Sequence, residues 1–438
     1  MIFRFFHIYF FTTMKRTYIL MGAAGGYISG GPIYQRNKAL FLQQRGWSVY
    51  YISCCHGKIY ISGLEDFIVE TCTFLTKPAY LFPKKYQQIL LNYILKKLPH
   101  QMGDVVIETG TDYTAYWGEL LAEKLNGRHI ITLLDEYNDK ITSKVAPFYK
   151  FKYGRKELAC ISDEVMIHIF SSFIPECKAK QYSLVCYCSN SLENVNPLWV
   201  SDIPSGDLVV GYIGRLEKKA MPFILDGIRK YADENKEKKI VFLCIGGSDH
   251  HSIERDIKNS LINCANVTVY ITGFLFPIPL ECVEKCDIIF STAGSCLVGA
   301  RASVPTVRIH QINNTIQGFI QKYSSKEYYV YENANTVFDY IKLFSQGTPC
   351  PRLDKYDINK EWKTIEGYFD KHLDFLAKAD SKFDYFNFKK INLNWKERLY
   401  KYSFFLLGMR LHHLLWKNNY EVYNISYASI PVFSCRRL

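Results

Sequence analysis

The sequence predicts an α/β protein made of two domains, each with a parallel sheet that is covered by helices on both faces. Three observations lead to this prediction. Short apolar segments of strand length alternate with helical segments along most of the chain, which is the order that parallel sheets require. A Pro- and Ser-rich stretch at residues 194–207 interrupts this alternation, and the pattern restarts after it. With 438 residues, the chain is long enough for two sizeable cores.

We therefore expect an N-terminal domain at residues 14–195, a second domain at 205–345, crossover helices at 346–380 and a tail at 381–438. The first domain begins with a strand at 17–21, a glycine-rich loop at 22–31 and a helix at 36–45 that Gly46 stops. The glycines do not form the GxGxxG dinucleotide fingerprint. They leave a loop over a helix N-terminus, where a ligand or a facing domain can approach the backbone closely.

The remaining elements of the first domain follow the same alternation. Strands are predicted at 47–53, 104–108, 128–134 and 157–161, and helices at 86–98, at 113–125 and from Asp163, with Ser162 or Asp163 as the cap. In the second domain, strands are predicted at 208–213, 240–245 and 267–272, and helices at 222–231, 252–261, 279–285, after Gly318 and at 336–344. A helix at 360–377 is long enough to pack back across the first domain.

Residues 287–307 form the most informative unit, which we interpret as strand, small-residue loop, helix and a strand led by proline. Ile288, Ile289 and Phe290 make a short buried strand. Residues 291–295, Ser-Thr-Ala-Gly-Ser, then place hydroxyls and bare backbone at the carboxyl end of that strand. Open α/β sheets bind ligands at this edge, and a helix that starts there favours an anion. For this loop alone, an ordinary tight turn is the alternative.

Two more loops of the second domain carry similar chemistry. Gly214, Arg215, Lys218 and Lys219 come directly after the 208–213 strand. Gly246-Gly247-Ser248-Asp249 follows the 240–245 strand in the same way. A fork-shaped guanidinium and an ammonium group suit a diphosphate. If the strands are parallel neighbours, all three loops share one edge of the sheet, and the sequence predicts an anion site there.

The composition restricts the possible partners. The 54 Lys and Arg residues exceed the 42 Asp and Glu residues and give a net charge of +12, which favours phosphates, anionic lipid or nucleic acid. The sequence has no nucleic-acid motif and no zinc-finger spacing, so no nucleic-acid partner is expected. The 14 cysteines form no CxxC pair. We expect them to be small buried residues in a reducing cytosol.

The two ends of the chain differ from the rest. Residues 1–13 are apolar but too short for a membrane span, and they are interpreted either as an anchor or as a result of start-site choice. The tail is basic and aromatic. Residues 389–417 contain one acid, Glu397, and seven basic residues: Lys389, Lys390, Lys396, Arg398, Lys401, Arg410 and Lys417. Such a helix either lies on an anionic membrane surface or docks on the protein body.

From residue 17 to residue 377, the order of motifs resembles the GT-B glycosyltransferases, especially family 4 (group 1), the enzymes of bacterial surface-polysaccharide synthesis. "GYIGRLEKK" resembles the donor-phosphate motif, and "FLCIGG" and "VYITGF" resemble the next two strand segments. "CDIIFSTAG…GARASVPTV" resembles the final unit of that family. In the first domain, Gly25-Gly26 and Gly30-Gly31 stand where the family has a Gly-Gly loop.

The resemblance implies transfer of a sugar from a nucleotide-diphosphate sugar, bound between the domains, to a glycan or lipid-linked glycan. It implies no tightly held metal and no cofactor besides this donor substrate. Arg215 and Lys219, or Lys218, would hold the diphosphate and stabilise the leaving group. The other implied donor contacts are Gly25, Gly26, Gly30, Gly31, Gly214, Gly246, Gly247, Ser291, Thr292, Gly294 and Ser295. The enzyme is expected in the cytoplasm, at the inner face of the membrane if the tail binds it.

The sequence departs from the family at two points. The paired glutamates of the last motif are absent, since Gly294 and Ser295 lie near the first position and Val298 or Gly299 occupies the second. The family's first-domain histidine is not evident. The carboxylates near strand ends are either candidates for acceptor recognition and general base or ordinary loop carboxylates; they are Glu108, Asp112, Asp135 and Glu136.

These departures leave other functions open. A nucleotide-sugar epimerase would share the fold, but it would need carboxylates in the cleft as acid and base. A non-catalytic scaffold that binds nucleotide sugars fits the missing glutamates. The sugar, the nucleotide, the acceptor, the stereochemical outcome and the oligomeric state are not determined by these motifs.

Overall fold

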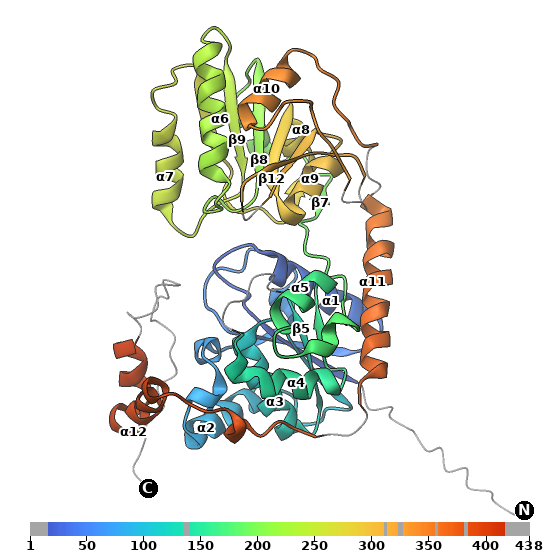
Figure 1. Ribbon diagram of the computed structural model, residues 1–438, viewed down its shortest axis with the longest axis vertical. Coiled ribbons are helices and arrows are strands. Elements are labelled where there is room, and N and C mark those ends of the chain that lie inside the picture. Colours follow the sequence, from blue (N-terminus) through green and yellow to red (C-terminus); the bar gives the residue numbers. More distant parts are fainter. Residues whose placement is uncertain are drawn as a thin grey trace, which may run out of the picture.

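The computed structural model describes residues 16–134, 141–310, 313–322, 327–354, 358–380 and 384–416. The chain folds into two α/β domains, which lie one above the other in Figure 1. The domain boundaries given above stay predictions. The stretch before the predicted linker already pairs with the second domain, because β7 (Leu192–Glu193) forms a two-stranded parallel sheet with β11 (Ile278–Pro279).

The first domain is built around a six-stranded parallel sheet in the order β3-β2-β1-β4-β5-β6. Its strands are β1 (Thr17–Gly22), β2 (Ser48–Ser53), β3 (Ile68–Thr71), β4 (Val105–Thr109), β5 (Arg128–Leu133) and β6 (Leu158–Cys160). Its helices are α1 (Gly30–Gln44), α2 (Lys84–Leu95), α3 (Asp112–Leu125), α4 (Ala146–Gly154) and α5 (Asp163–Phe170). Ser162 caps α5, because its side chain accepts a hydrogen bond from the Val165 amide.

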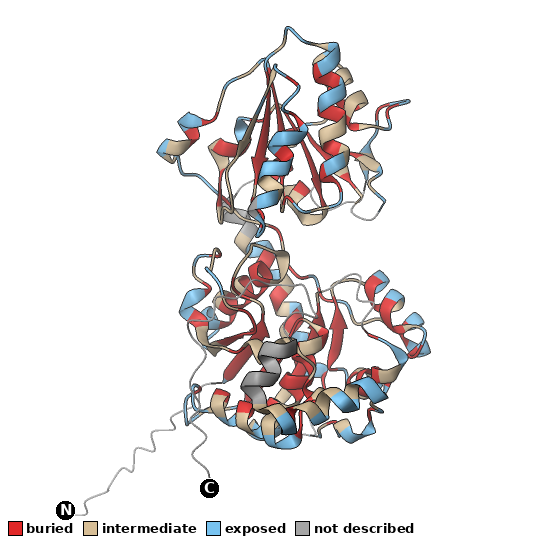
Figure 2. Ribbon diagram, turned by 90° about the vertical axis from the view of Figure 1, so that its left-hand side faces the viewer, coloured by how far each residue is buried: buried red, intermediate tan, exposed pale blue. Residues whose placement is uncertain are grey.

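Alternate residues of β1 enter different cores. Ile19 and Met21 belong to one hydrophobic cluster, whereas Tyr18 and Leu20 belong to another. Because side chains of a strand point alternately to the two faces of the sheet, both faces are covered. Figure 2 shows the central strands of both sheets as buried, and β1, β4, β8, β9 and β12 are buried along their whole length.

The second domain has a seven-stranded sheet in the order β10-β9-β8-β12-β13-β14-β15. Its strands are β8 (Leu208–Ile213), β9 (Ile240–Ile245), β10 (Val267–Ile271), β12 (Ile288–Thr292), β13 (Thr306–Ile309), β14 (Ile316–Ile320) and β15 (Tyr328–Tyr329). Its helices are α6 (Met221–Glu234), α7 (His251–Ser260), α8 (Leu280–Glu284), α9 (Cys296–Arg301) and α10 (Val337–Ser345). The first five strands of the order are parallel, and β14 and β15 are antiparallel additions.

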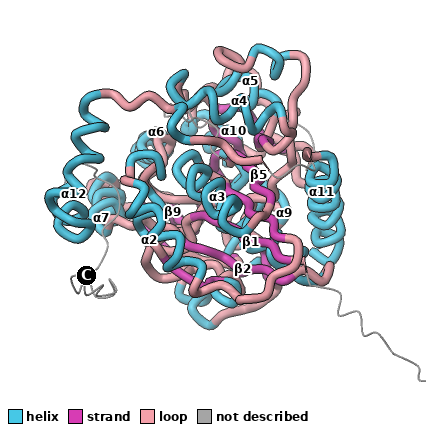
Figure 3. Tube along the Cα trace, turned by 90° about the horizontal axis from the view of Figure 1, so that it is seen from below, coloured by secondary structure: helices cyan, strands magenta, loops and turns pink. Residues whose placement is uncertain are grey.

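Helix α11 (Ile358–Lys378) returns the chain to the first domain, as its predicted length indicated. Ile365, Phe369 and Leu376 are buried in the same cluster as Phe41 of α1. Figure 1 shows α11 running from the second domain down the side of the first. Figure 3, the view from below, places α11 and the last helix, α12 (Trp395–Trp416), on opposite sides of the first domain.

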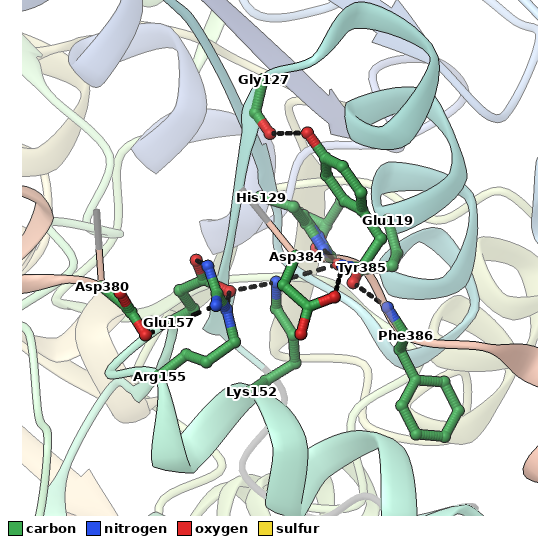
Figure 4. Close-up of polar contacts among 11 residues, drawn as sticks. Glu119, Gly127, His129, Lys152, Arg155, Glu157, Asp380, Asp384, Tyr385 and Phe386 are labelled. Atoms are coloured by element: carbon green, nitrogen blue, oxygen red, sulfur yellow. Dashed lines mark hydrogen bonds and ion pairs between the residues drawn. The ribbon is translucent and has the colours of Figure 1, made fainter. Parts of the chain in front are cut away.

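The segment between α11 and α12 is part of the core of the first domain. The Phe386 amide donates to Oε1 of the buried Glu119 at 2.8 Å, and the ring of Phe386 is buried among aromatic side chains. Lys152 and His129 hold Oε2 of the same carboxylate at 2.9 Å and 2.8 Å (Figure 4). Burial opposes ionisation, but the charge of Lys152 and the hydrogen bonds lower the pKa of Glu119 to about 2. The start of the tail, ahead of the predicted basic helix at 389–417, is therefore packed against the first domain.

Some element predictions were wrong. The helix predicted directly after Gly318 is not found in the described residues that follow it, because Gly318 lies within β14 and pairs with Arg308 of β13. Gly318 has a φ of +116°, and a Cβ there would lie 2.5 Å from the carbonyl oxygen of Tyr329, so glycine permits the close pairing of three strands. Strand β3 and helix α4 were not predicted. The expected burial of the cysteines is confirmed for most of those in the described part of the chain, whereas the reducing compartment stays a prediction.

Within the residues that the structure describes, no helix combines the length and the apolar character that crossing a bilayer requires.

Candidate functional site

The three predicted loops of the second domain meet at one edge of its sheet. Strands β9, β8 and β12 are consecutive and parallel, so their carboxyl ends lie side by side. The loops that follow them line a cavity of about 1440 Å³, whose other wall is formed by the first domain. The predicted convergence of the loops is confirmed, and the cavity lies where open α/β sheets bind ligands.

Glycines let the first two loops touch through their backbones. Gly246 has a φ of +152°, and a Cβ on it would lie only 2.0 Å from the carbonyl oxygen of Gly214. The Leu216 amide also donates to the Gly247 carbonyl at 3.2 Å. Gly214 and Gly246 line the cavity, whereas Gly247 does not, because it packs under residues 273–274. Gly247 therefore shapes the loop without facing the ligand space.

The cationic side chains lie directly above these glycines. Arg215, Lys218 and Lys219 all line the cavity. Lys218 Nζ donates to Thr292 Oγ1 at 2.8 Å, which ties the first loop to the third. The Arg215 side chain is 40% exposed; it lies 3.3 Å from Glu217 Oε1, and its guanidinium carbon is 5.7 Å from the ring centre of Tyr27 in the first domain. Arg215 thus reaches across the cleft.

The residues at the end of β12 and just after it have two different roles. Ser291 is buried and donates to the Ile213 carbonyl at 2.6 Å, so the expectation that it contacts the donor does not fit its position. Thr292, Gly294 and Ser295 line the cavity. Ser189, in the connection between the domains, donates to the Gly294 carbonyl at 3.2 Å and holds this turn.

The first-domain wall contains half of the predicted glycines. Gly30 and Gly31, at the start of α1, line the cavity together with Tyr27. Gly25 and Gly26 do not line it, because they pack on a neighbouring loop: a Cβ on Gly25 would lie 2.9 Å from the Gly57 carbonyl oxygen, and the Gly26 amide donates to the Lys58 carbonyl at 3.0 Å. The expectation that Gly25 and Gly26 contact the donor is therefore not supported by their positions.

Glu108 does not face the cleft, contrary to expectation. It is buried in β4, forms an ion pair with Lys38 and accepts hydrogen bonds from Tyr18 and Tyr34. Burial raises the pKa of a carboxyl group, but here the charge of Lys38 and these hydrogen bonds lower the pKa of Glu108 to about 2. The charge on Glu108 is neutralised inside the protein, so Glu108 cannot serve as a base that meets an acceptor.

Asp112 is the predicted carboxylate that does reach the cleft. It is the first residue of α3, and Gly110, Thr111, Asp112 and Tyr113 all line the cavity. Glu217 is the other acidic side chain of the described residues that lines it, and Glu217 pairs with Arg215. Asp135 and Glu136, the other candidates, lie outside the described residues.

Sequence reasoning did not identify several cavity residues. Tyr27, Ser189, Asn190 and Arg301 line the cavity without having been chosen. Arg301 is buried at the end of α9, with its guanidinium carbon 5.2 Å from the ring centre of Tyr187. An arginine within the otherwise small and apolar 296–304 segment was a usable signal for it. Tyr187, Ser189 and Asn190 had no such signal, because their place in the cleft follows from the path of the connection between the domains.

Among the residues that the structure describes, no three His, Cys, Asp or Glu side chains lie close enough together to hold a metal ion. The expectation of a metal-independent reaction stays a prediction.

Two Rossmann-like α/β domains that face each other across a cleft, with the anion-suited loops on the second domain, define the GT-B architecture. Comparison with solved structures agrees. A glycosyltransferase from Rickettsia africae is similar with a TM-score of 0.54 and 15% identity, over 84% of this chain and 100% of that one. Anabaena HepE, solved with UDP and glucose, is similar with a TM-score of 0.50 and 11% identity, over 82% and 99%. No protein-family model and no curated protein matches the sequence. At these identities the likeness establishes the fold.

Proposed function

We propose that this protein is a glycosyltransferase that moves a hexose-type sugar from a nucleotide-diphosphate sugar to a glycan or lipid-linked glycan. The observation that carries the proposal is the convergence of Arg215, Lys218 and Lys219 at the sheet edge, beside the cavity-lining residues Thr292, Gly294 and Ser295. Three cations over glycine-rich loops suit the two phosphates of such a donor. HepE, of the same fold, was solved with UDP, which makes uridine the first nucleotide to test.

The chemistry assigned to the site is a displacement at the anomeric carbon of the sugar. The bond from this carbon to the diphosphate oxygen breaks, and its electron pair leaves with the nucleoside diphosphate. Arg215 and Lys219, or Lys218, stabilise the negative charge that develops on this leaving group. An acceptor hydroxyl forms the new bond and gives up its proton, for which Asp112 on the opposite wall is the candidate base.

The finer assignments belong to this proposal as well. They are membership of family 4, the use of no tightly bound metal and no additional cofactor, a role in bacterial surface-polysaccharide synthesis, and a cytoplasmic location at the inner face of the membrane. The motif order of the second domain supports the family assignment. The three cations support metal independence, because they can neutralise a diphosphate without a divalent ion.

Incubation with a panel of UDP-sugars tests the proposal. Without an acceptor, we expect slow release of UDP by hydrolysis of the donor. UDP release should become faster when a lipid extract or an oligosaccharide mixture supplies an acceptor. Interconversion of one sugar into another would replace the transferase by the epimerase alternative. UDP binding without any turnover would favour the scaffold, and the absence of UDP binding by calorimetry would refute the nucleotide-sugar site.

A further inference from the structure

Helix α12 docks on the first domain through one face. The ring of Phe404 is buried, with its centre 4.9 Å from that of Phe82, which lies just before α2. Lys401 Nζ donates to the Tyr80 carbonyl at 3.1 Å, and Glu397 forms an ion pair with Lys144. Figure 1 shows α12 beside α2. These contacts fix which side of the helix points away from the protein, up to the break at Gly408, whose φ is 65°.

The opposite side carries a continuous apolar stripe. Trp395, Leu399, Tyr402 and Leu406 are spaced by four, three and four residues, which places them on one face of a helix. Their exposed fractions are 70%, 56%, 66% and 86%, and the adjacent Phe405 is 64% exposed. Other exposed large apolar side chains in the described part of the chain are scattered. Single exposed apolar residues are ordinary, but a contiguous patch marks an interaction surface.

Positive charge borders this stripe. Lys389, Lys390, Lys396 and Arg398 are exposed, and within the described residues none of the four forms an ion pair. The neighbouring acid, Glu397, is already neutralised by Lys144. Lys84 and Lys85, at the start of α2, are also exposed, next to Tyr86, whose ring centre is 5.6 Å from that of Phe404. The apolar stripe is therefore surrounded by basic side chains. Within the described part of α12, the only carboxylate, Glu397, is already paired with Lys144 and does not neutralise their charge.

We infer that the outer face of α12 binds an anionic lipid bilayer. Aromatic and aliphatic side chains enter the interface, while the basic side chains around them meet anionic headgroups. A second copy of the chain is a poorer occupant, because packing two such faces together would bring two sets of cations into contact. The surface belongs to the first domain, which also contributes Asp112 to the cleft. A lipid-linked acceptor is the substrate class that this arrangement serves, and this last step alone rests on the proposed function.

Vesicle sedimentation of the full-length chain tests the inference. We expect it to sediment with vesicles of phosphatidylcholine and phosphatidylglycerol and to stay in solution with phosphatidylcholine alone. Removing two charges with Lys396→Ala/Arg398→Ala should lower the partition coefficient by about fivefold per charge. Removing apolar contact with Leu399→Ala/Leu406→Ala should lower it about tenfold or more. All four side chains are exposed, so the variants should melt like the wild type.

Matched variants on the second domain serve as controls. Lys236→Ala/Lys258→Ala removes the same charge, and Ile262→Ala removes an exposed apolar side chain; both should bind vesicles like the wild type. Equal binding of the α12 variants and the wild type, or no binding by the wild type, would overturn the inference. So would a dimer, detected by light scattering, that the Leu399→Ala/Leu406→Ala change disrupts. UDP affinity should be unaffected throughout, so loss of lipid binding and failure of the nucleotide-sugar site are separate results.

Discussion

Arg215 is the residue on which the proposed donor site should depend most. Its planar and permanently charged group lies in the cleft, close to both Glu217 and Tyr27. Arg215→Ala should weaken UDP binding about ten- to a hundredfold, since hydrogen bonds to charged groups contribute about 1.5–3 kcal/mol each. Turnover should fall about thirty- to a thousandfold. Calorimetry and initial rates measure the two effects.

The matched control for this change is Arg229→Ala. Arg229 is an exposed arginine whose ion pair with Asp226 lies on the surface of α6. Its replacement should leave both UDP affinity and turnover unchanged. If UDP affinity is equal in wild type and Arg215→Ala, and the melting profiles agree, the diphosphate binds elsewhere.

Two carboxylates that look alike in the sequence should respond oppositely to substitution. Asp112→Asn should keep the melting temperature and UDP affinity but lower turnover about a hundredfold or more, because the proposed base is removed. Glu108→Gln should instead lower the free energy of unfolding by about 3–5 kcal/mol, because it leaves Lys38 buried without its counter-charge. Thermal melting and donor turnover of both variants distinguish these effects. Full turnover by Asp112→Asn would place the base on another residue.

The sequence predicted the positions of the loops at the sheet edge better than the directions in which individual side chains point. Arg215, Lys218 and Lys219 could be placed because they follow a strand directly, and strand ends meet at one sheet edge. Glu108 also ends a predicted strand, but its side chain points into the interior of the first domain. There it forms an ion pair with Lys38 of α1. Whether a carboxylate at a strand end faces the cleft or the protein interior depends on how distant elements pack together. The local sequence pattern does not reveal this packing.

Among the elements, apolar strands were predicted well because burial on both faces leaves a continuous apolar run. Strands β8 and β9 have the predicted bounds. Strand β14 was not predicted because Gln317 and Gly318 interrupt its apolar pattern. It also pairs antiparallel with β13, so no helix is needed between the two strands, and the strand–helix alternation gave no signal for it. The packing of Phe386 was not predicted, because its burial depends on a carboxylate of α3 and on aromatic rings of α4.

The segment after α11 should therefore be essential for the stability of the first domain. Phe386→Ala is expected to lower its free energy of unfolding by about 3–5 kcal/mol, since a buried aromatic ring is removed. A chain that ends at Ala379 should lose more, because Glu119 also loses the Phe386 amide. Urea unfolding followed by circular dichroism measures both. The control Phe405→Ala, at an exposed position of α12, should unfold like the wild type, and an equally stable shortened chain would contradict the docked arrangement.

For the whole molecule, α11 packs the chain that returns from the second domain onto the first, and His372 is a buried polar residue of this helix. Nδ1 of His372 lies 3.1 Å from Lys38 Nζ, which donates to it, and Nε2–H donates to the Val185 carbonyl at 3.1 Å. Burial, and then the charge of Lys38, lower the pKa of His372 to about 3. Burial likewise lowers the pKa of His129 in the network of Figure 4. Both imidazoles are therefore neutral in the folded protein at neutral pH.

This arrangement predicts that acidification weakens the first domain well above the pH at which carboxylates titrate. An unfolded histidine titrates near pH ~6.5, so below that value the unfolded chain binds a proton that the folded chain does not. The contribution of His372 is thus complete above about pH 6.5 and is lost as the pH falls toward 3, by about 1.4 kcal/mol per pH unit. Glu108, with its pKa lowered to about 2, contributes in the same direction only below about pH 4.3. Melting between pH 7 and pH 5 should therefore show a steep fall for the wild type and a shallower one for His372→Gln, although this variant melts lower at pH 7. Parallel pH dependences for the two proteins would mean that His372 is not the group through which α11 responds to acid.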